Sequence, residues 1–139
     1  TYFEYFTKME LTMFGFEVFM TEVDDRGIDF IARRQGGHFI EVQAKAIRSL
    51  GYVFLRKTHF KPAATRFVAL GILTDGTEPK SYLIPSTVWH TPNQLFVDRD
   101  YDKPELKSAP EWGINVSAKN LPLLEQFKME TTLDWLCKD

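Results

Sequence analysis

The sequence predicts a single α/β domain over residues 1–139, with a central mixed β-sheet flanked by helices. Two neighbouring stretches alternate apolar and polar residues around a short glycine-containing turn, which is typical of a β-hairpin. Arg66–Leu73 is apolar almost throughout, as expected for an interior strand. Helical patterns near both ends supply covering layers, and 139 residues are enough to bury one core.

Residues 2–14 predict the first helix, and Gly15 follows it at a position where helices commonly end. The apolar side chains of this helix fall within one arc at helical spacing: Tyr2, Phe3, Phe6, Met9 and Met13. The next residues predict a first strand at Phe16–Thr21 and a polar turn at Glu22–Arg26.

The hairpin occupies Gly27–Ala46, where Gln35-Gly36-Gly37 supplies the permissive backbone of a tight turn. Side chains alternate along a strand, so Glu41, Gln43 and Lys45 share one face of its second half. Their apolar neighbours point the other way. The second half of the hairpin therefore presents a polar face and a core face.

The register of the hairpin decides whether Asp29 lies on that polar face. A two-residue loop would set Asp29 opposite Ala44, on the wrong face. A three-residue loop, which pairs Arg34 with His38, sets Asp29 directly opposite Gln43. We predict the second register, because it brings an acid, an amide and an amine within about 5 Å of one another across the pair.

The following residues predict further strands and a short helix. We expect strands at Tyr52–Arg56 and Ser81–Ile84, in addition to Arg66–Leu73. A short helix should run from Ser86, its N-cap, through Trp89.

The last third of the chain predicts less regular structure. Residues 91–112 are polar and hold three prolines, so we expect a long surface connection. Ile114–Val116 predicts a short edge strand. Leu121–Phe127 and Thr131–Leu136 predict closing helices.

The combination of Asp29 on one strand with Gln43 and Lys45 on the next resembles the PD-(D/E)XK nuclease superfamily. Its pattern is an Asp, then an acidic residue, any residue and Lys on the following strand. Gln43 stands at the acidic position, as in the small bacterial branch whose third strand reads QxK. The resemblance implies a restriction-endonuclease-like fold.

The resemblance extends over roughly residues 2–90. Glu4 lies eleven residues before Gly15, which is the interval of a helix glutamate in small bacterial members. Arg56-Lys57, Phe67–Leu73 and Tyr82–Ser86 match later strands of the family.

What the resemblance implies is metal-dependent hydrolysis of nucleic acid, with DNA as the favoured substrate and Mg²⁺, or Mn²⁺, as cofactor. Such hydrolysis needs positive charge beside the phosphate and an oriented water. Mg²⁺ prefers oxygen ligands, so the implied ligands are Asp29, the Gln43 amide, the Ala44 carbonyl and Glu4, the last directly or through water. Lys45 would hold the attacking water or stabilise the developing charge.

Two acidic positions stay open. The helical arc places Glu10 at its edge and Glu4 on the far side, so Glu10 is the alternative helix acid. Glu41 lies two residues before Gln43 on the same face. It either supplies the negative charge that Gln43 lacks or is an ordinary exposed strand residue.

Charge is distributed unevenly along the chain. The net charge is −2, but residues 26–66 hold nine Arg or Lys against two acidic residues, a balance of +7. A basic segment around the site is what a phosphate-backbone binder needs, and scattered solvated charge is the alternative. Tyr52 and Phe54 either contact nucleic acid or belong to a half-buried strand. The basic residues we expect to contact nucleic acid are Arg33, Arg34, Arg48, Arg56 and Lys57.

Other features narrow the class of protein. Cys137 is the single cysteine, which excludes an internal disulfide and a cysteine-based zinc site. No apolar run approaches the ~20 residues of a membrane span, so we expect a cytoplasmic protein. His38, His59 and His90 show no ligand spacing, although His59 lies in the basic segment.

Two rival functions belong to other classes. The first is a noncatalytic DNA-binding or assembly module that kept the fold while Gln43 weakened its metal site. The second is a domain whose hairpin only mediates protein contact, with Asp29 and Lys45 forming a cross-strand ion pair worth ~0.2–1 kcal/mol if exposed. A homodimer is also left open.

Overall fold

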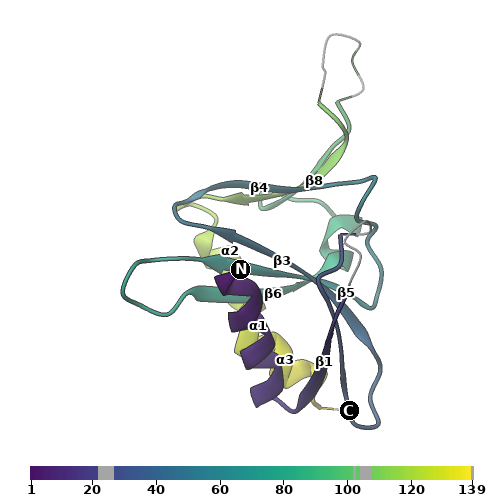
Figure 1. Cartoon of the computed structure of the whole chain (residues 1–139). Helices are drawn as coiled ribbons and strands as arrows, with labels where there is room; N and C mark the ends of the chain where they lie inside the picture. The colour runs from purple at the N-terminus through teal and green to yellow at the C-terminus, as the bar shows by residue number, and fades with distance from the viewer. Residues whose placement is uncertain (22–26, 102, 104–107, 139) are drawn as a thin grey trace.

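A computed structural model describes residues 1–21, 27–101, 103 and 108–138. Its elements form three layers (Figure 1): a five-stranded sheet lies in the middle, helices α1 and α3 cover one face, and a three-stranded sheet covers the other. The polar turn expected at Glu22–Arg26 lies outside the described residues.

The central sheet has the strand order β1-β2-β3-β5-β6. Strands β3 and β5 are parallel and the other pairs are antiparallel, so the sheet is mixed, as predicted. Six of the seven residues of β5 are buried, which confirms its interior position. The strand bounds are Phe16–Met20 for β1, Phe30–Arg34 for β2, Ile40–Ile47 for β3, Arg66–Ile72 for β5 and Lys80–Pro85 for β6.

A second sheet has the order β4-β8-β7 and comprises Gly51–Arg56, Glu111–Val116 and Phe96–Arg99. The long connection predicted over 91–112 is therefore wrong, because it contains β7 and the start of β8. Ile114–Val116 belongs to the middle strand of this sheet and not to an edge. These strands are short and their outer residues are polar, so neither composition nor prolines distinguish them from a loop.

Helix α1 spans Tyr2–Met13 and buries Phe3, Phe6 and Leu11 against the central sheet. The predicted apolar arc is only partly correct, because Met9 and Met13 are exposed. The helix carries apolar residues on more than one face, and the sequence alone does not say which face meets the sheet.

Shorter helices complete the chain. A 3₁₀ helix, η1, begins at Ser86 and ends at His90, but Pro85 is its N-cap. The Ser86 hydroxyl instead bonds both backbone groups of Ala63, at 2.9 Å each. No helix among the described residues is long and apolar enough to span a membrane. The remaining helices are α2 at Leu121–Leu124, η2 at Glu125–Phe127 and α3 at Met129–Leu136.

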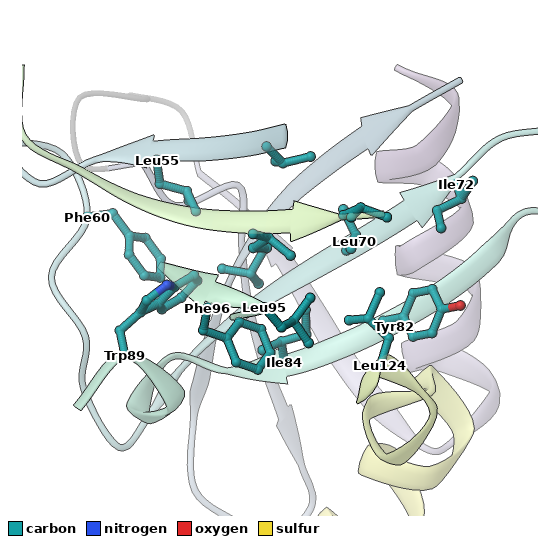
Figure 2. Packing of buried hydrophobic residues seen from close by; sticks show 14 of the residues in the cluster. Leu55, Phe60, Leu70, Ile72, Tyr82, Ile84, Trp89, Leu95, Phe96 and Leu124 are labelled. Carbon is teal, nitrogen blue, oxygen red and sulfur yellow. The ribbon is translucent and has the colours of Figure 1, made fainter. Parts of the chain in front are cut away.

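Two apolar clusters hold the layers together. Figure 2 shows the cluster between the two sheets, where Phe60 lies against Trp89 and Leu70 is on the strand beside Tyr82. The second cluster joins α1 and α3 to the other face of the central sheet. The odd-numbered residues of β3 therefore face the three-stranded sheet and its even-numbered residues face the helices.

A glycine sets the distance between α1 and the central sheet. A Cβ at Gly71 would lie 2.5 Å from the Phe3 ring, and Phe3 is 2% exposed, so the ring has no room to move. We expect Gly71→Ala to lower the free energy of unfolding by ~1–3 kcal/mol through overpacking. A Cβ at Gly51 meets nothing within 4 Å, so Gly51→Ala is the matched control. Urea unfolding of both variants checks this, and equal midpoints would contradict it.

Candidate active site

The hairpin has the register that the sequence predicted. Phe30 pairs with Val42 and Ala32 with Ile40, and the same register continued by one residue sets Asp29 opposite Gln43. The turn is closed by a hydrogen bond of 2.9 Å from the Gly37 N–H to the Arg34 carbonyl. Because the register is the predicted one, the odd-numbered residues of both strands share the face toward the second sheet.

The Asp29 carboxylate is held against the backbone of β3. Its Oδ2 accepts a hydrogen bond of 2.8 Å from the backbone N–H of Ala44. The Asp29 N–H donates to the Val42 carbonyl at 2.9 Å. Because Ala44 lies between Gln43 and Lys45, the carboxylate contacts β3 between these two residues.

Gln43 and Lys45 line one pocket of about 400 Å³ between β3 and β4. Arg56 and His59 line the same pocket from β4 and the turn that follows it. Lys45 is half-buried and forms no ion pair with any other described residue. The pocket thus combines an amide with positive charge, next to the Asp29 carboxylate.

The amide oxygen of Gln43 is buried and has no hydrogen-bond partner among the described residues, while its nitrogen donates a long bond of 3.4 Å to the Ala44 carbonyl. Gly27 lies beside this oxygen, and a Cβ there would collide with the His59 carbonyl at 2.8 Å, while the φ of 65° also favours glycine. An unpaired buried acceptor costs ~1–3 kcal/mol. Such an oxygen is suited to a ligand that supplies positive charge.

The turn that carries His59 is firmly anchored. The N–H groups of His59 and Phe60 both donate to the Arg56 carbonyl at 3.0 Å, and the Trp112 indole donates to the Phe60 carbonyl at 3.0 Å. These bonds hold Arg56 and His59 at the pocket. The sequence analysis gave His59 only a minor role in the site. It missed Gly27, for which the one indication in the sequence is its position two residues before Asp29.

The two candidate helix acids lie elsewhere. α1 covers the face of the central sheet opposite Gln43 and Lys45. Glu4 completes a capping box at the start of α1, 2.8 Å from the backbone nitrogen of Thr1. Glu10 lines a different pocket, where its burial and then the nearby acids raise the pKa of its carboxyl.

Glu41 is engaged in an ion pair. Its Oε1 lies 3.1 Å from Nε of Arg66 on the neighbouring strand, and the Thr65 hydroxyl also donates to it at 3.3 Å. This agrees with the interpretation of Glu41 as a strand residue on the sheet surface and offers no sign of a part in the pocket.

Most of the predicted nucleic-acid contacts have partners within the protein. Arg34 donates to the Cys137 carbonyl at 3.2 Å, and Arg48 pairs with Asp75 at 3.1 Å. The guanidinium of Arg33 lies 4.8 Å from the centre of the Phe39 ring. These three arginines are therefore engaged in contacts within the protein.

Lys57 is likewise committed. It contacts both Asp98 and Asp100 and lies over the Trp112 ring. Burial alone would lower the pKa of Lys57, but the hydrogen bonds to the two carboxylates outweigh it and raise the pKa. Of the five predicted contacts, Arg56 lines the candidate pocket.

The described residues contain no group of three or more His, Cys, Asp or Glu that could hold a metal ion. Oxygen donors nevertheless lie close together here: the Gln43 amide lines the pocket, and the Asp29 carboxylate and the Ala44 carbonyl adjoin Gln43 on β3 without lining it. Hard cations such as Mg²⁺ accept this donor set, so the residues present fit a divalent cation.

Comparison with known proteins supports the fold. No family model matches the sequence, and the search of curated proteins finds no match. Among solved structures, the chain is similar to Hjc from Archaeoglobus fulgidus, a Holliday junction resolvase from an archaeal hyperthermophile. The TM-score is 0.59 with 14% sequence identity, and the match covers 95% of this chain and 93% of the resolvase.

The fold is restriction-endonuclease-like. The predicted fold class is therefore confirmed, with its five-stranded mixed sheet and its helices. At 14% identity the likeness carries no information on individual site residues.

The unpaired oxygen of Gln43 leads to a stability prediction. Gln43→Leu keeps the volume but removes the unsatisfied polar group, so thermal unfolding in EDTA should occur at the same temperature or higher. Thr132→Val is the matched control, because the buried Thr132 hydroxyl donates to the Leu83 carbonyl at 2.7 Å. Its loss should cost ~1 kcal/mol. If both variants lose the same stability, the Gln43 oxygen is not an unsatisfied group.

Proposed function

We propose that this chain is a divalent-metal-dependent endonuclease that hydrolyses phosphodiester bonds of nucleic acid, with DNA as the favoured substrate. The observation that carries the proposal is the unpaired, buried oxygen of Gln43 in a pocket shared with Lys45. The Asp29 carboxylate contacts β3 between these two residues. An acid, an amide and an amine are thereby gathered at one end of a strand pair.

In this proposal the cation would be held by oxygens of Asp29, Gln43 and Ala44, and Glu4 takes no part because it lies on the other side of the central sheet. A divalent cation at this position supplies positive charge beside the phosphodiester. Gln43 contributes no charge of its own, so the site binds a cation less tightly than a two-carboxylate site would, and Mn²⁺ should be favoured over Mg²⁺.

Lys45 is the proposed partner of the reacting phosphate. Its ammonium forms no ion pair with another described residue, so it can donate to a phosphate oxygen or to the attacking water. Arg56 lines the same pocket and is exposed, with no ion pair in the described part of the chain. Both side chains favour an anionic ligand over a neutral one.

The likeness to a Holliday junction resolvase supports DNA as the substrate class. A four-way DNA junction therefore belongs among the substrates to be tested. The alternative function is a noncatalytic DNA-binding module, which is favoured by the single carboxylate among the proposed pocket donors. The two functions differ in their need for metal, so a metal titration separates them.

Metal binding is the first test of this proposal. Asp29→Ala should abolish Mn²⁺ binding in calorimetry, because it removes the one charged ligand proposed among the described residues. Gln43→Glu should tighten binding, since it adds a negative charge at the same position. Glu41→Gln serves as the control and should bind as wild type does, because Glu41 pairs with Arg66. Unchanged Mn²⁺ binding by Asp29→Ala would exclude the proposed site.

Cleavage is the second test. We expect wild-type protein to cut at least one of a panel of labelled substrates in Mg²⁺ or Mn²⁺: duplex DNA, a four-way junction, single-stranded DNA and RNA. Lys45→Ala should reduce the cleavage rate at least ~100-fold, as for loss of a group that stabilises transition-state charge, while Mn²⁺ binding persists. Lys61→Ala removes an exposed lysine outside the pocket and should cut normally. Cleavage by Lys45→Ala at the wild-type rate would refute this role.

A further inference from the structure

The outer face of the β4-β8-β7 sheet carries a row of aromatic and basic side chains. Val53 and Leu55 of β4 are buried in the core between the sheets. Because side chains alternate, Tyr52, Phe54 and Arg56 point to the opposite, outer side. The row runs along an edge strand, since β4 pairs with β8 on one side.

Phe54 is the accessible ring of this row. Its side chain is 43% exposed, and its ring is nearly parallel to that of Tyr52, with a centroid distance of 6.4 Å. Its cross-strand partner is Gly113, which has no side chain beside it. A large aromatic surface thus lies open next to the candidate active site.

A second pocket, of about 420 Å³, lies over this face and is lined by Tyr52, Phe54, Arg56 and Arg99. Phe54 and Arg56 also line the pocket that contains Gln43 and Lys45. The two pockets therefore adjoin along these two residues.

The charge of this face suits a polyanion. Glu111 of β8 lies opposite Arg56 on one neighbouring strand and opposite Arg99 on the other. Glu111 is 6% exposed, so the two guanidinium groups dominate the accessible charge. Among the described residues, this part of the face thus carries one buried acid between two arginines.

The aromatic part is fixed before any ligand binds. The Tyr52 ring lies over Gly113, where a Cβ would collide with it. The Arg99 guanidinium lies over the same ring, 4.5 Å from its centre. A ring held in this way loses little side-chain freedom when a base stacks beside it.

We propose that this outer face binds unpaired nucleotides of the DNA substrate, with a base stacked on Phe54 and the backbone contacting Arg56 and Arg99. The substrate class is DNA with a single-stranded segment next to the cleaved bond. The inference rests on the proposed function for its substrate, but binding at this face requires neither metal nor cleavage. Bases within a duplex are already stacked on their neighbours, whereas unpaired bases can stack on an aromatic side chain.

Binding in EDTA tests the proposal. Fluorescence anisotropy would compare a labelled single strand with the same strand in a duplex. Phe54→Ala should weaken single-strand binding by about 5- to 150-fold per stacked base and leave duplex binding unchanged. Phe19→Ala is the matched control, because Phe19 is 47% exposed on β1, the edge strand of the other sheet, and lines neither pocket. It should bind both probes as wild type does.

Two further substitutions separate stacking from apolar contact and from misfolding. Phe54→Trp should keep single-strand binding, and Phe54→Leu should lose most of it although it keeps an apolar side chain. Quenching of a 2-aminopurine in the single strand should follow the same order. Equal binding by Phe54→Leu and wild type, or equal losses for single strand and duplex, would overturn the proposal.

The outcomes also separate this inference from the proposed function. If wild type binds no single strand, the face is not a nucleic-acid surface and the inference is wrong, whatever the cleavage assay shows. If single-strand binding depends on Phe54 but no substrate is cut, the inference holds and the nuclease function fails.

Discussion

The antiparallel register between β2 and β3 is the constraint on which the candidate site depends. It sets Asp29 opposite Gln43, and the bond from the Ala44 N–H then holds the carboxylate beside β3. A slip of one residue would turn Asp29 to the helix side of the sheet. The large apolar residues on the even-numbered face, such as Phe30 and Val42, prevent that slip because they are fully buried under the helices.

Burial on the two faces of β3 has different consequences. The helix face is filled by apolar side chains, whereas the other face carries Gln43 and Lys45 at the margin of the core between the sheets. There the second sheet ends and leaves a pocket. The Gln43 oxygen without a partner is the kind of local cost that folded proteins accept at functional sites.

Much of the central sheet and of the hairpin was predictable from the sequence. Period-two alternation and turn glycines identify local structure reliably when one face of a strand is buried. The three-stranded sheet was not predictable, because β7 and β8 are short, polar on one side and separated by prolines. The basic segment over residues 26–66 was also misleading, because its charged side chains do not all serve the same purpose. Whether Lys57 or Arg34 meets solvent or an internal partner depends on residues far away in the chain, such as Asp98 and Cys137.

The sequence by itself determined the two strands of the hairpin and the shared face of Gln43 and Lys45, because both follow from local alternation. Two turn lengths were compatible with it, and the register that sets Asp29 opposite Gln43 was chosen for the side chains that it brings together. Folding added what depends on distant segments: the burial of the Gln43 oxygen, the anchored turn with His59, and the junction of two pockets at Phe54. These features arise where β4 meets β3 and β8, and no local pattern encodes which surfaces come together across such a distance in the chain.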